Sequence, residues 1–336
     1  MTYLSCLRAW ALPLLPGLLL SVTVGAAAGF LGMHYDAPVM LFALLLGMAF
    51  NFLHADSSCQ AGVDFASRFI LRLGVGLLGI RIAIDDLAQV GLAGAATIAT
   101  LIALTIATGF VVAPLLGRPW RFALLTGGSV AICGASAALA IAAVIPPNEK
   151  MEQSTLFTVM AVTTMSTIAM VAYPLLFQFL GFDNLQQGFL IGATIHDVAQ
   201  VVGAGFSVSD EAGELATIVK LFRVAMLPVV LTGIVLVLRA TKTGGPDGKI
   251  AFLPWFMVLF LALLTGGSLI GIPAPIIANV ELVSRACLIT AIAALGIKTS
   301  LRTLSEVGGG HLVVVVIETL VLLALAVAAL QMFDLV

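Results

Sequence analysis

The chain contains eleven apolar segments, and several of them are long enough to cross a lipid bilayer. A helix needs about 20 apolar residues for one crossing. Hydrophobic residues make up 61% of the 336 residues and charged residues only 10%, which leaves too little polar sequence to cover a soluble protein of this size. The pattern predicts an all-α polytopic membrane protein. The segments span approximately residues 12–33, 38–53, 66–81, 91–116, 122–146, 153–181, 187–206, 215–239, 252–271, 283–298 and 308–333.

The polar residues between these segments indicate no second domain, so we expect one transmembrane domain over residues 1–336. The longest polar break, RATKTGGPDGK at 239–249, has the Gly and Pro residues of a loop. The 15 basic and 17 acidic residues form no basic patch, which argues against nucleic-acid binding. The cysteines are too scattered for a disulfide framework or a metal site; they are Cys6, Cys59, Cys133 and Cys287.

Charge asymmetry predicts the orientation of the chain. Basic residues cluster near Arg8, around 118–121 and in the 239–249 loop, whereas GFSVSDEAGE at 205–214 has three acids and no base. Loops on the cytoplasmic side of a membrane protein carry an excess of Lys and Arg. We therefore expect the amino terminus in the cytoplasm and the acidic loop outside, with Arg81 as an exception.

Self-comparison indicates an internal repeat. Residues 67–91 align without a gap with residues 284–308 at nine identities in 25 positions, where composition alone would give roughly three. The odd number of apolar segments from one copy to the next predicts an inverted repeat, as in secondary transporters. The repeat units would be about 38–116 and 252–333, around a central region at about 122–239. Two apolar helices that have converged in composition are the alternative.

Two central segments differ from ordinary membrane helices. GGSVAICGASAALA at 127–140 is rich in Gly and Ser, and the stretch 186–205, which includes GATIHDVAQVVGAG at 192–205, contains polar and ionisable residues. Backbone that leaves the helix at membrane depth is tolerated where protein covers it or where it lines a cavity, so we expect both segments to be interrupted at a substrate site. Close helix packing is the alternative for the first segment. Whether they are broken spans or re-entrant hairpins is left open.

Ionisable residues inside these segments are candidates for the transport pathway, because an unpaired charge in a membrane helix is costly. His196, whose ordinary pKa lies near neutrality, is the candidate for proton coupling. Asp197 could carry a proton, hold a cation or pair with a base, and it shares a helix face with Gln200. The alternative is that His196 and Asp197 only cap a helix end.

Basic residues follow in the next segment, where Lys220 and Arg223 share one helix face. Facing inwards, they would attract an anion; otherwise they would extend to the outer interface. Weaker candidates are Glu318, Arg68, Arg72 and Arg285.

Three motifs carry a resemblance to a known family. GGSVAICGASAALAIAAVI at 127–145, GATIHDVAQVVGAG at 192–205 and KLFRVAMLPVVL at 220–231 occur in this order and spacing. They resemble the YeiH-type sulfate exporter family of bacterial inner-membrane proteins, over nearly the whole chain. The resemblance implies a fold related to the cation/proton antiporter and bile-acid transporter superfamily. It also implies the substrate-site residues, with Asp197 where the family pattern has Glu; they are Ser129, Cys133, Gly134, Ser136, Thr194, His196, Asp197, Gln200, Lys220 and Arg223.

These observations predict a secondary active transporter, not an enzyme, that moves a small anion such as sulfate or an organosulfonate by alternating access. The chain has no Walker A motif for direct ATP coupling. We expect no cofactor, H⁺ or Na⁺ as coupling ion, and a small anion and the bilayer as partners, with a homodimer left open. One alternative is a monovalent cation/proton antiporter with Asp197 as ion carrier. A remote one is an intramembrane enzyme with Ser129 or Ser136 as nucleophile and His196 as base.

Overall fold

The computed structural model describes residues 12–35, 39–54, 57–80, 84–146, 151–241, 254–270, 272–299 and 310–333. Every regular element in these ranges is a helix, which confirms the all-α class. Arg8, Arg81, the 242–249 part of the polar loop and the end of the second repeat copy lie outside the described residues.

Six helices or continuous helix pairs are long and apolar enough to cross a membrane. Shorter apolar helices accompany them. This mixture agrees with a polytopic membrane protein in which some apolar segments do not form a straight crossing. The six are Leu12–Tyr35, Gly91–Leu115, Gln153–Phe179, Asp210–Ala240, Ala274–Lys298 and Leu312–Phe333.

The chain forms two compact units. The first comprises residues 1–86, 202–209 and 254–302, and the second comprises residues 87–201, 210–253 and 303–336. The first unit contains α2 (Leu15–Tyr35), α3 (Val39–Ala49), α4 (Ser57–Phe65), α5 (Leu71–Leu78), α14 (Trp255–Ile270) and α15 (Ala274–Lys298), with 3-10 turns at Leu12–Leu14 and Asn51–Leu53 and a π-helical turn at Ala66–Ile70.

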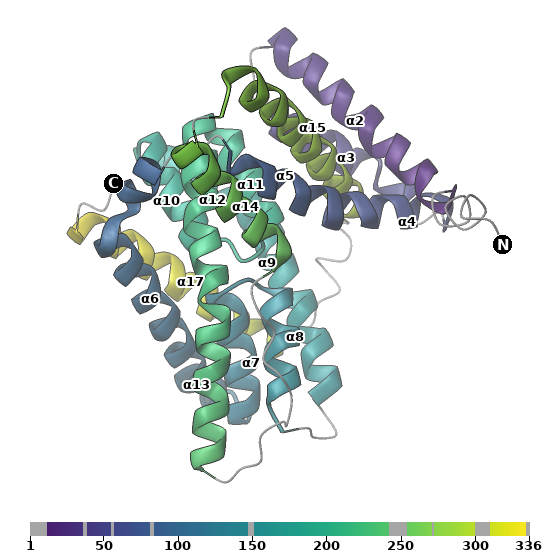
Figure 1. The fold of residues 1–336 in the computed structure, drawn as a ribbon. Helices are drawn as coiled ribbons and strands as arrows, with labels where there is room; N and C mark the ends of the chain where they lie inside the picture. The colour runs from purple at the N-terminus through teal and green to yellow at the C-terminus, as the bar shows by residue number, and fades with distance from the viewer. Residues whose placement is uncertain are drawn as a thin grey trace, which may run out of the picture. The chain divides into compact units, whose positions relative to one another are not determined.

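The second unit contains most of α6 (Ile84–Leu115), then α7 (Trp120–Ala131), α8 (Ala135–Val144), α9 (Met151–Phe179), α10 (Asn184–Thr194), α12 (Asp210–Ala225), α13 (Leu227–Ala240) and α17 (Gly310–Phe333). The helix α11 (Val198–Val208) begins in this unit. Figure 1 labels these helices along the chain.

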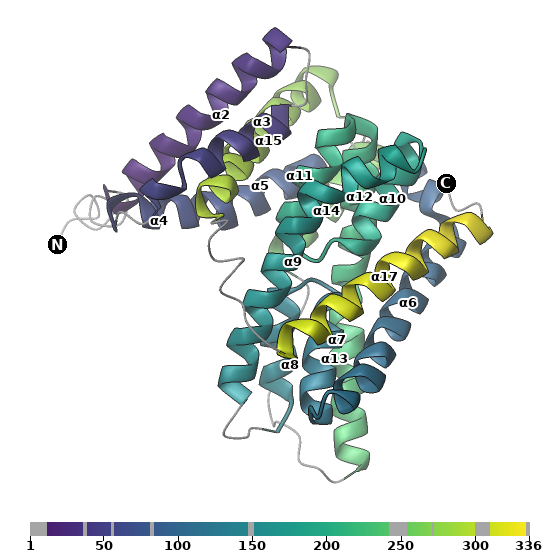
Figure 2. The same cartoon turned by 180° about the vertical axis from the view of Figure 1, so that it is seen from behind.

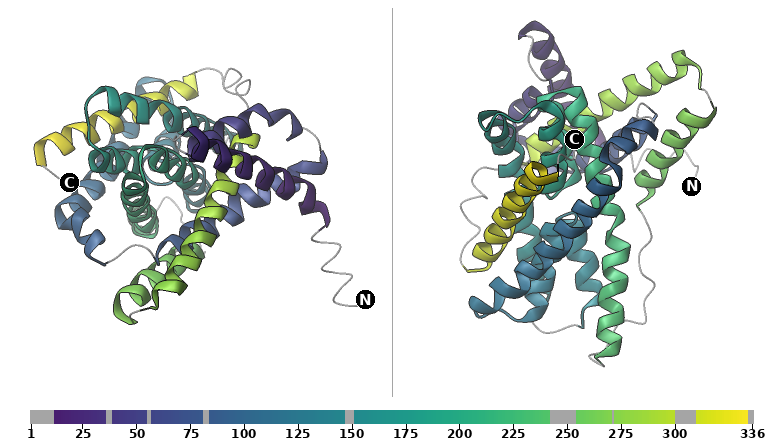
Figure 3. Two further views of the ribbon diagram at one scale, coloured as in Figure 1. Left: turned by 90° about the horizontal axis from the view of Figure 1, so that it is seen from above. Right: turned by 90° about the vertical axis from the view of Figure 1, so that its left-hand side faces the viewer.

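Small residues let the helices of the first unit approach closely. Helices α2, α3 and α15 pack against one another (Figure 3). A Cβ atom on Gly47 of α3 would lie 2.4 Å from the Ala293 carbonyl oxygen, and one on Gly296 of α15 would lie 2.3 Å from the Leu44 carbonyl oxygen. The two backbones therefore touch at these glycines, which is typical of helix packing in membranes.

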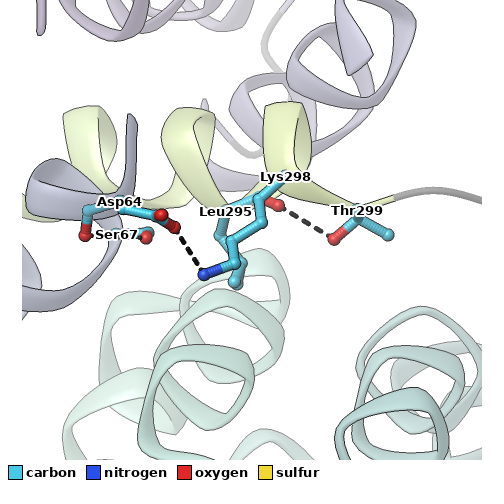
Figure 4. A network of polar contacts seen from close by, with 5 residues as sticks. All are labelled: Asp64, Ser67, Leu295, Lys298 and Thr299. Carbon is cyan, nitrogen blue, oxygen red and sulfur yellow. Dashed lines mark hydrogen bonds and ion pairs between the residues drawn. The ribbon is translucent and has the colours of Figure 1, made fainter. Parts of the chain in front are cut away.

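A charge at the end of α15 is paired within the same unit. Lys298 Nζ lies 2.6 Å from Asp64 Oδ1 of α4, and both side chains are about one-third exposed (Figure 4). Beside them, the Ser67 hydroxyl donates to the Asp64 carbonyl and the Thr299 hydroxyl donates to the Leu295 carbonyl. The ion pair joins the carboxyl end of α15 to α4.

The described parts of the two predicted repeat copies are mostly helical, and residues 67–80 and 284–299 lie in the first unit. Ser67 and Ser284, which are equivalent in the alignment, are both buried, and the Arg68 and Arg285 side chains that follow them are both exposed. The Ser284 hydroxyl donates to the Gly74 carbonyl, so the two copies pack against each other. The inverted relation between the copies stays a prediction.

The first interrupted segment forms a hairpin. The helix stops at Ala131 and resumes at Ala135. A Cβ atom on Gly128 would lie 2.3 Å from Ile141 Cδ1, and a straight helix would separate these residues by about 20 Å at 1.5 Å per residue. The helices α7 and α8 therefore run side by side in opposite directions (Figure 1).

The second interrupted segment also turns back. The chain leaves the helix at residues 195–197, between α10 and α11. Positions Gly188 and Gly192 of α10 face Ala212 and Ala216 of α12, respectively. Because the two pairs follow the same order, α10 and α12 are parallel, and the chain between them must return to the level where α10 begins. The helix is thus interrupted at both predicted places, and at each the chain turns back; that these hairpins are re-entrant in a membrane stays a prediction.

The hairpins lie at opposite ends of α9. The α7–α8 hairpin precedes this helix along the chain, and the α10–α11 hairpin follows it after a turn at residues 180–183. The α9 helix is long enough to cross a bilayer. The two hairpins therefore start from opposite ends of α9 and extend toward each other. In this arrangement their tips are the parts that can meet.

Candidate functional site

The tips of the two hairpins lie against each other. Gly134, in the α7–α8 tip, has φ 62° and ψ −122°, a conformation that essentially only glycine adopts. A Cβ atom at this position would lie 3.5 Å from His196 Cβ in the α10–α11 tip. The two segments singled out by sequence, 127–140 and 192–205, thus form one site.

At each tip, the carboxyl end of a helix lies inside the protein. The last carbonyl groups of a helix have no partner within it and carry about half a negative charge in total. Here α7 ends at Ala131 and α10 ends at Thr194, and both ends are fully buried. Such buried ends need donors from elsewhere in the fold.

Arg223 supplies donors to both helix ends. Its Nη2 donates to the carbonyls of Val130 and Ala131 at 2.8 Å each, and its Nε donates to Ala131 at 3.0 Å. Its Nη1 donates to Gly192 at 3.1 Å and to Ile195 at 2.9 Å. All five N–H groups of the guanidinium are therefore used, three on the first hairpin and two on the second.

Lys220, one turn earlier on α12, completes the arrangement. Its Nζ donates to the carbonyls of Ile132 at 2.7 Å and Ile195 at 3.0 Å, and also to the carbonyl of His196. An ammonium group has three N–H donors, so it too is fully used. The two cations of α12 join the two hairpin tips.

The Lys220 and Arg223 side chains both point into the protein. They are 0% and 1% exposed, so the interpretation that they extend to the outer interface is wrong. Since backbone carbonyls occupy all their N–H groups in this conformation, any attraction they exert on an anion acts through space. Their role as substrate ligands stays a prediction.

His196 is fully buried and makes one side-chain hydrogen bond. Its Nε2 lies 3.0 Å from Thr319 Oγ1 on α17, and the Thr319 hydroxyl can donate its only hydrogen to the Val315 carbonyl at 2.7 Å or to this nitrogen. The contact with Thr319 can form with either ring nitrogen carrying the proton. Nδ1 has no hydrogen-bond partner among the described residues.

Asp197 and Gln200 begin α11 and differ in burial. The Asp197 side chain is half-buried and accepts a hydrogen bond from the Ala199 N–H at 3.2 Å, and its own N–H donates to Ser166 Oγ at 3.0 Å. Asp197 therefore caps a helix, which is one part of the alternative interpretation, whereas the His196 side chain contacts Thr319. Gln200 is buried, and its Oε1 has no partner in the described part of the chain.

The predicted hydroxyl and thiol groups differ in burial. The hydroxyls of Ser129 and Thr194 are buried and donate to carbonyls of their own helices, those of Leu125 and Leu190. Cys133 is a buried free thiol in the first tip. Ser136 is exposed on α8. The structure thus gathers most of the predicted residues at the tips and leaves Ser136 with an exposed side chain.

Two partners of the site were missing from the sequence interpretation. Ser166 of α9 and Thr319 of α17 contact Asp197 and His196. Ser166 is one of several hydroxyl residues of α9, and Thr319 lies in a long apolar helix, so no sequence signal singles either out. Three weaker candidates, Arg68, Arg72 and Arg285, have exposed side chains. No three His, Cys, Asp or Glu residues of the described ranges come together as metal ligands.

Comparisons with known proteins identify the family of the chain. The family described as Conserved hypothetical protein 698 matches residues 16–315. The chain is 47% identical over 316 residues to the UPF0324 membrane protein CT0845 of Chlorobaculum tepidum, covering 94% of this chain and 88% of that protein. It is 51% identical over 311 residues to RB0971 of Rhizobium meliloti, with 91% and 89% covered, and 51% identical over 310 residues to TauZ of Paracoccus denitrificans, with 91% and 92% covered.

No solved structure matches the chain. The family match and the relatives, each of which aligns over about nine-tenths of both sequences, confirm the resemblance carried by the three motifs. The chain belongs to the UPF0324 family of multi-pass bacterial membrane proteins, the YeiH-type family.

Proposed function

We propose that this protein is a secondary active transporter of a small oxyanion or organosulfonate, such as sulfate, in the bacterial inner membrane, and that it works by alternating access. The observation that carries the proposal is the meeting of two hairpin tips from opposite ends of α9, with the buried cations Lys220 and Arg223 between them. Interrupted helices that meet at mid-depth are the form that binding sites take in secondary transporters.

The charges at the tips favour an anion. Two buried cations contribute about +2, and an ionised Asp197 contributes about −1. The helix ends of α7 and α10 add about −0.5 each, and the beginnings of α8 and α11 add about +0.5 each, so these four terms cancel. A net charge of about +1 remains, and backbone N–H groups at the starts of α8 and α11 are suited to an oxyanion.

His196 gives the site a means of proton coupling. Its Nδ1 is buried and has no partner among the described residues. A second proton on the imidazole would add a positive charge and a new N–H donor beside the tips, and both changes would strengthen anion binding. This favours H⁺ over Na⁺ as the coupling ion.

The two alternatives find less support. In a cation/proton antiporter the Asp197 carboxylate would bind the ion, but here it accepts a hydrogen bond within its own helix and two buried cations lie in the same tips. In a serine enzyme His196 would bond the nucleophile, but its described side-chain partner is Thr319 and Ser129 donates to Leu125. We therefore retain the anion transporter.

The test is flux of isotopic sulfate, sulfite, thiosulfate and taurine into proteoliposomes. We expect at least one of these to enter faster than into protein-free liposomes, and His196→Ala to reduce that flux about tenfold or more, because the proton acceptor is lost. His34→Ala changes an exposed histidine of α2 in the first unit and should leave the flux unchanged. Equal flux in the two variants, or no flux of any of the four, would contradict the proposal.

A further inference from the structure

Glu318 is a buried acid that the proposed function does not use. It is the acidic residue of α17 and lies within the apolar span Leu312–Phe333. Its side chain is 0% exposed. An ionisable group at such a position is expensive to keep, which makes it a candidate for function.

The contacts of Glu318 come from α7 and α6. Its Oε1 lies 2.8 Å from Thr126 Oγ1 of α7, and a Cβ atom on Gly109 of α6 would lie 2.7 Å from the same oxygen. Its Oε2 has no hydrogen-bond partner among the described residues. Glycine at 109 thus makes room for the carboxyl, and Figure 2 shows α17 crossing this part of the second unit.

The elements around α17 carry few groups that could balance a carboxylate; one is His196, which contacts the next residue, Thr319. The helices α6, α7, α9 and α10 pack around α17. The span Gly91–Leu115 of α6 and all of α10 contain no titratable side chain, α9 has Glu152 and Tyr173, and α7 has Arg121. The Arg121 guanidinium lies over the Trp120 ring at 5.1 Å, and no ion pair joins it to Glu318 in the described ranges.

Complete burial without an ion pair among the described residues favours a protonated carboxyl. The Thr126 hydroxyl has one hydrogen, and the Phe122 carbonyl oxygen of its own helix lies 3.1 Å away to accept it. The same hydroxyl can instead donate to Glu318 Oε1 at 2.8 Å, so this contact suits either protonation state of the carboxyl. A neutral acid also avoids the cost of several kcal/mol, roughly, of an unpaired charge in an apolar interior.

We propose that Glu318 is a second proton-binding site, which carries one proton in this conformation and releases it to water when α17 moves during transport. This inference rests on the proposed function. It is joined to the anion site through α17, because the next residue, Thr319, shares a hydrogen bond with His196. A shift of α17 relative to the tips would therefore change both contacts together.

Infrared difference spectra of the reconstituted full chain at two pH values report this carboxyl without a transport assay. We expect a C=O stretching band of a protonated carboxyl that Glu318→Gln removes. Glu281→Gln, which changes a half-buried glutamate of α15, should keep the band. A band that is absent from the unmodified protein, or unchanged in Glu318→Gln, would overturn the proposal.

Isotopic sulfate, together with a pH-sensitive dye trapped in proteoliposomes, measures the protons moved per sulfate. We expect Glu318→Gln to move one proton fewer per sulfate than the unmodified protein, with sulfate exchange retained. Equal ratios would show that Glu318 keeps its proton permanently, as a structural group, and would overturn the proposal. If the unmodified protein carries no sulfate, the proposed function fails for that anion, and the infrared band decides the protonation of Glu318 on its own.

Discussion

At the scale of single residues, the site depends on two long cationic side chains that bond to backbone. Lys220 and Arg223 donate to the carbonyls at the ends of α7 and α10. Cations near the carboxyl end of a helix stabilise it, and here each cation reaches two such ends at once. Burial would be costly for either charge alone, but every N–H group has an acceptor.

The first prediction concerns Arg223. Replacing it with Ala leaves up to three buried carbonyls, those of Val130, Ala131 and Gly192, without a donor, while Ile195 keeps its bond from Lys220. An unsatisfied buried group costs about 1–3 kcal/mol, so we expect the free energy of unfolding to fall by about 3 kcal/mol or more. Thermal unfolding in detergent measures this loss.

Arg223→Lys is the informative control for that change. It keeps the charge but reduces the donors from five to three. We expect a loss of stability smaller than in Arg223→Ala but still measurable, because lysine lacks the planar guanidinium group that reaches both tips. If Arg223→Lys is as stable as the unmodified protein, charge alone holds the tips together and the hydrogen-bond geometry is unimportant.

The ionisable residues of the site could be predicted from the sequence, but their hydrogen-bond acceptors could not. A histidine, an acid and two bases in apolar segments are visible in the sequence as costly groups, and the structure gathers His196, Asp197, Lys220 and Arg223 at the tips. The acceptors of the bases are carbonyls of apolar residues such as Ala131 and Ile195. Every residue has such a carbonyl, so its use depends on the backbone path and has no sequence signature.

At the scale of elements, the parallel contact between α10 and α12 determines how the second hairpin turns back. Gly188 and Gly192 face Ala212 and Ala216 at distances that leave no space for a side chain. Small residues at this spacing allow two helix backbones to touch. The same contact holds the Gly192 carbonyl within reach of Arg223.

The second prediction concerns this contact between α10 and α12. A Cβ atom at position 192 would lie 2.5 Å from the Ala216 carbonyl oxygen, so Gly192→Val must push α10 away from α12 and move the carbonyl that Arg223 bonds. We expect a loss of at least about 2 kcal/mol in stability from this overpacking and loss of anion flux.

Gly233 on α13 provides the matched control, because no atom lies within 4 Å of a Cβ placed there. Gly233→Val should leave stability and flux near those of the unmodified protein, and both variants can be compared by thermal unfolding and by the same flux assay. Equal stability of the two variants would mean that the close contact between α10 and α12 is not needed for the α10–α11 hairpin.

At the scale of the whole molecule, the hairpins determine which loops share a membrane face. In the second unit, the start of α7 and the end of α13 lie at one end, with Arg118, Arg121 and Arg239. The turn at 180–183 and the start of α12 lie at the other end, with Asp183 and Asp210. The positive-inside rule then predicts that the basic end faces the cytoplasm.

The third prediction tests this topology. Single cysteines at exposed positions, Leu180→Cys and Glu211→Cys, in a background without the four native cysteines, should both react with a membrane-impermeant maleimide added to intact cells. Leu116→Cys, exposed at the opposite end, should react only after the membrane is opened. Labelling of Glu211→Cys but not Leu180→Cys from outside would contradict the α10–α11 hairpin, since a full crossing at 187–206 places them on opposite faces.

The sequence alone determined the membrane class, the helical character, the family and the two places where helices break. These properties follow from local composition: apolar length sets the crossings, and Gly, Ser and ionisable residues mark 127–140 and 192–205 as poor continuous helices. Each signal lies within a short window of residues and therefore needs no knowledge of what the window contacts.

Only the tertiary structure decided that each break is a hairpin, that the two tips meet, and that Lys220 and Arg223 bond to backbone between them. A broken crossing and a hairpin can have the same local sequence, and they differ in which distant helix packs alongside. For α10 that helix is α12, whose alanines admit the glycines of α10. The direction of the chain after a break is set by packing between distant segments, which no local pattern encodes.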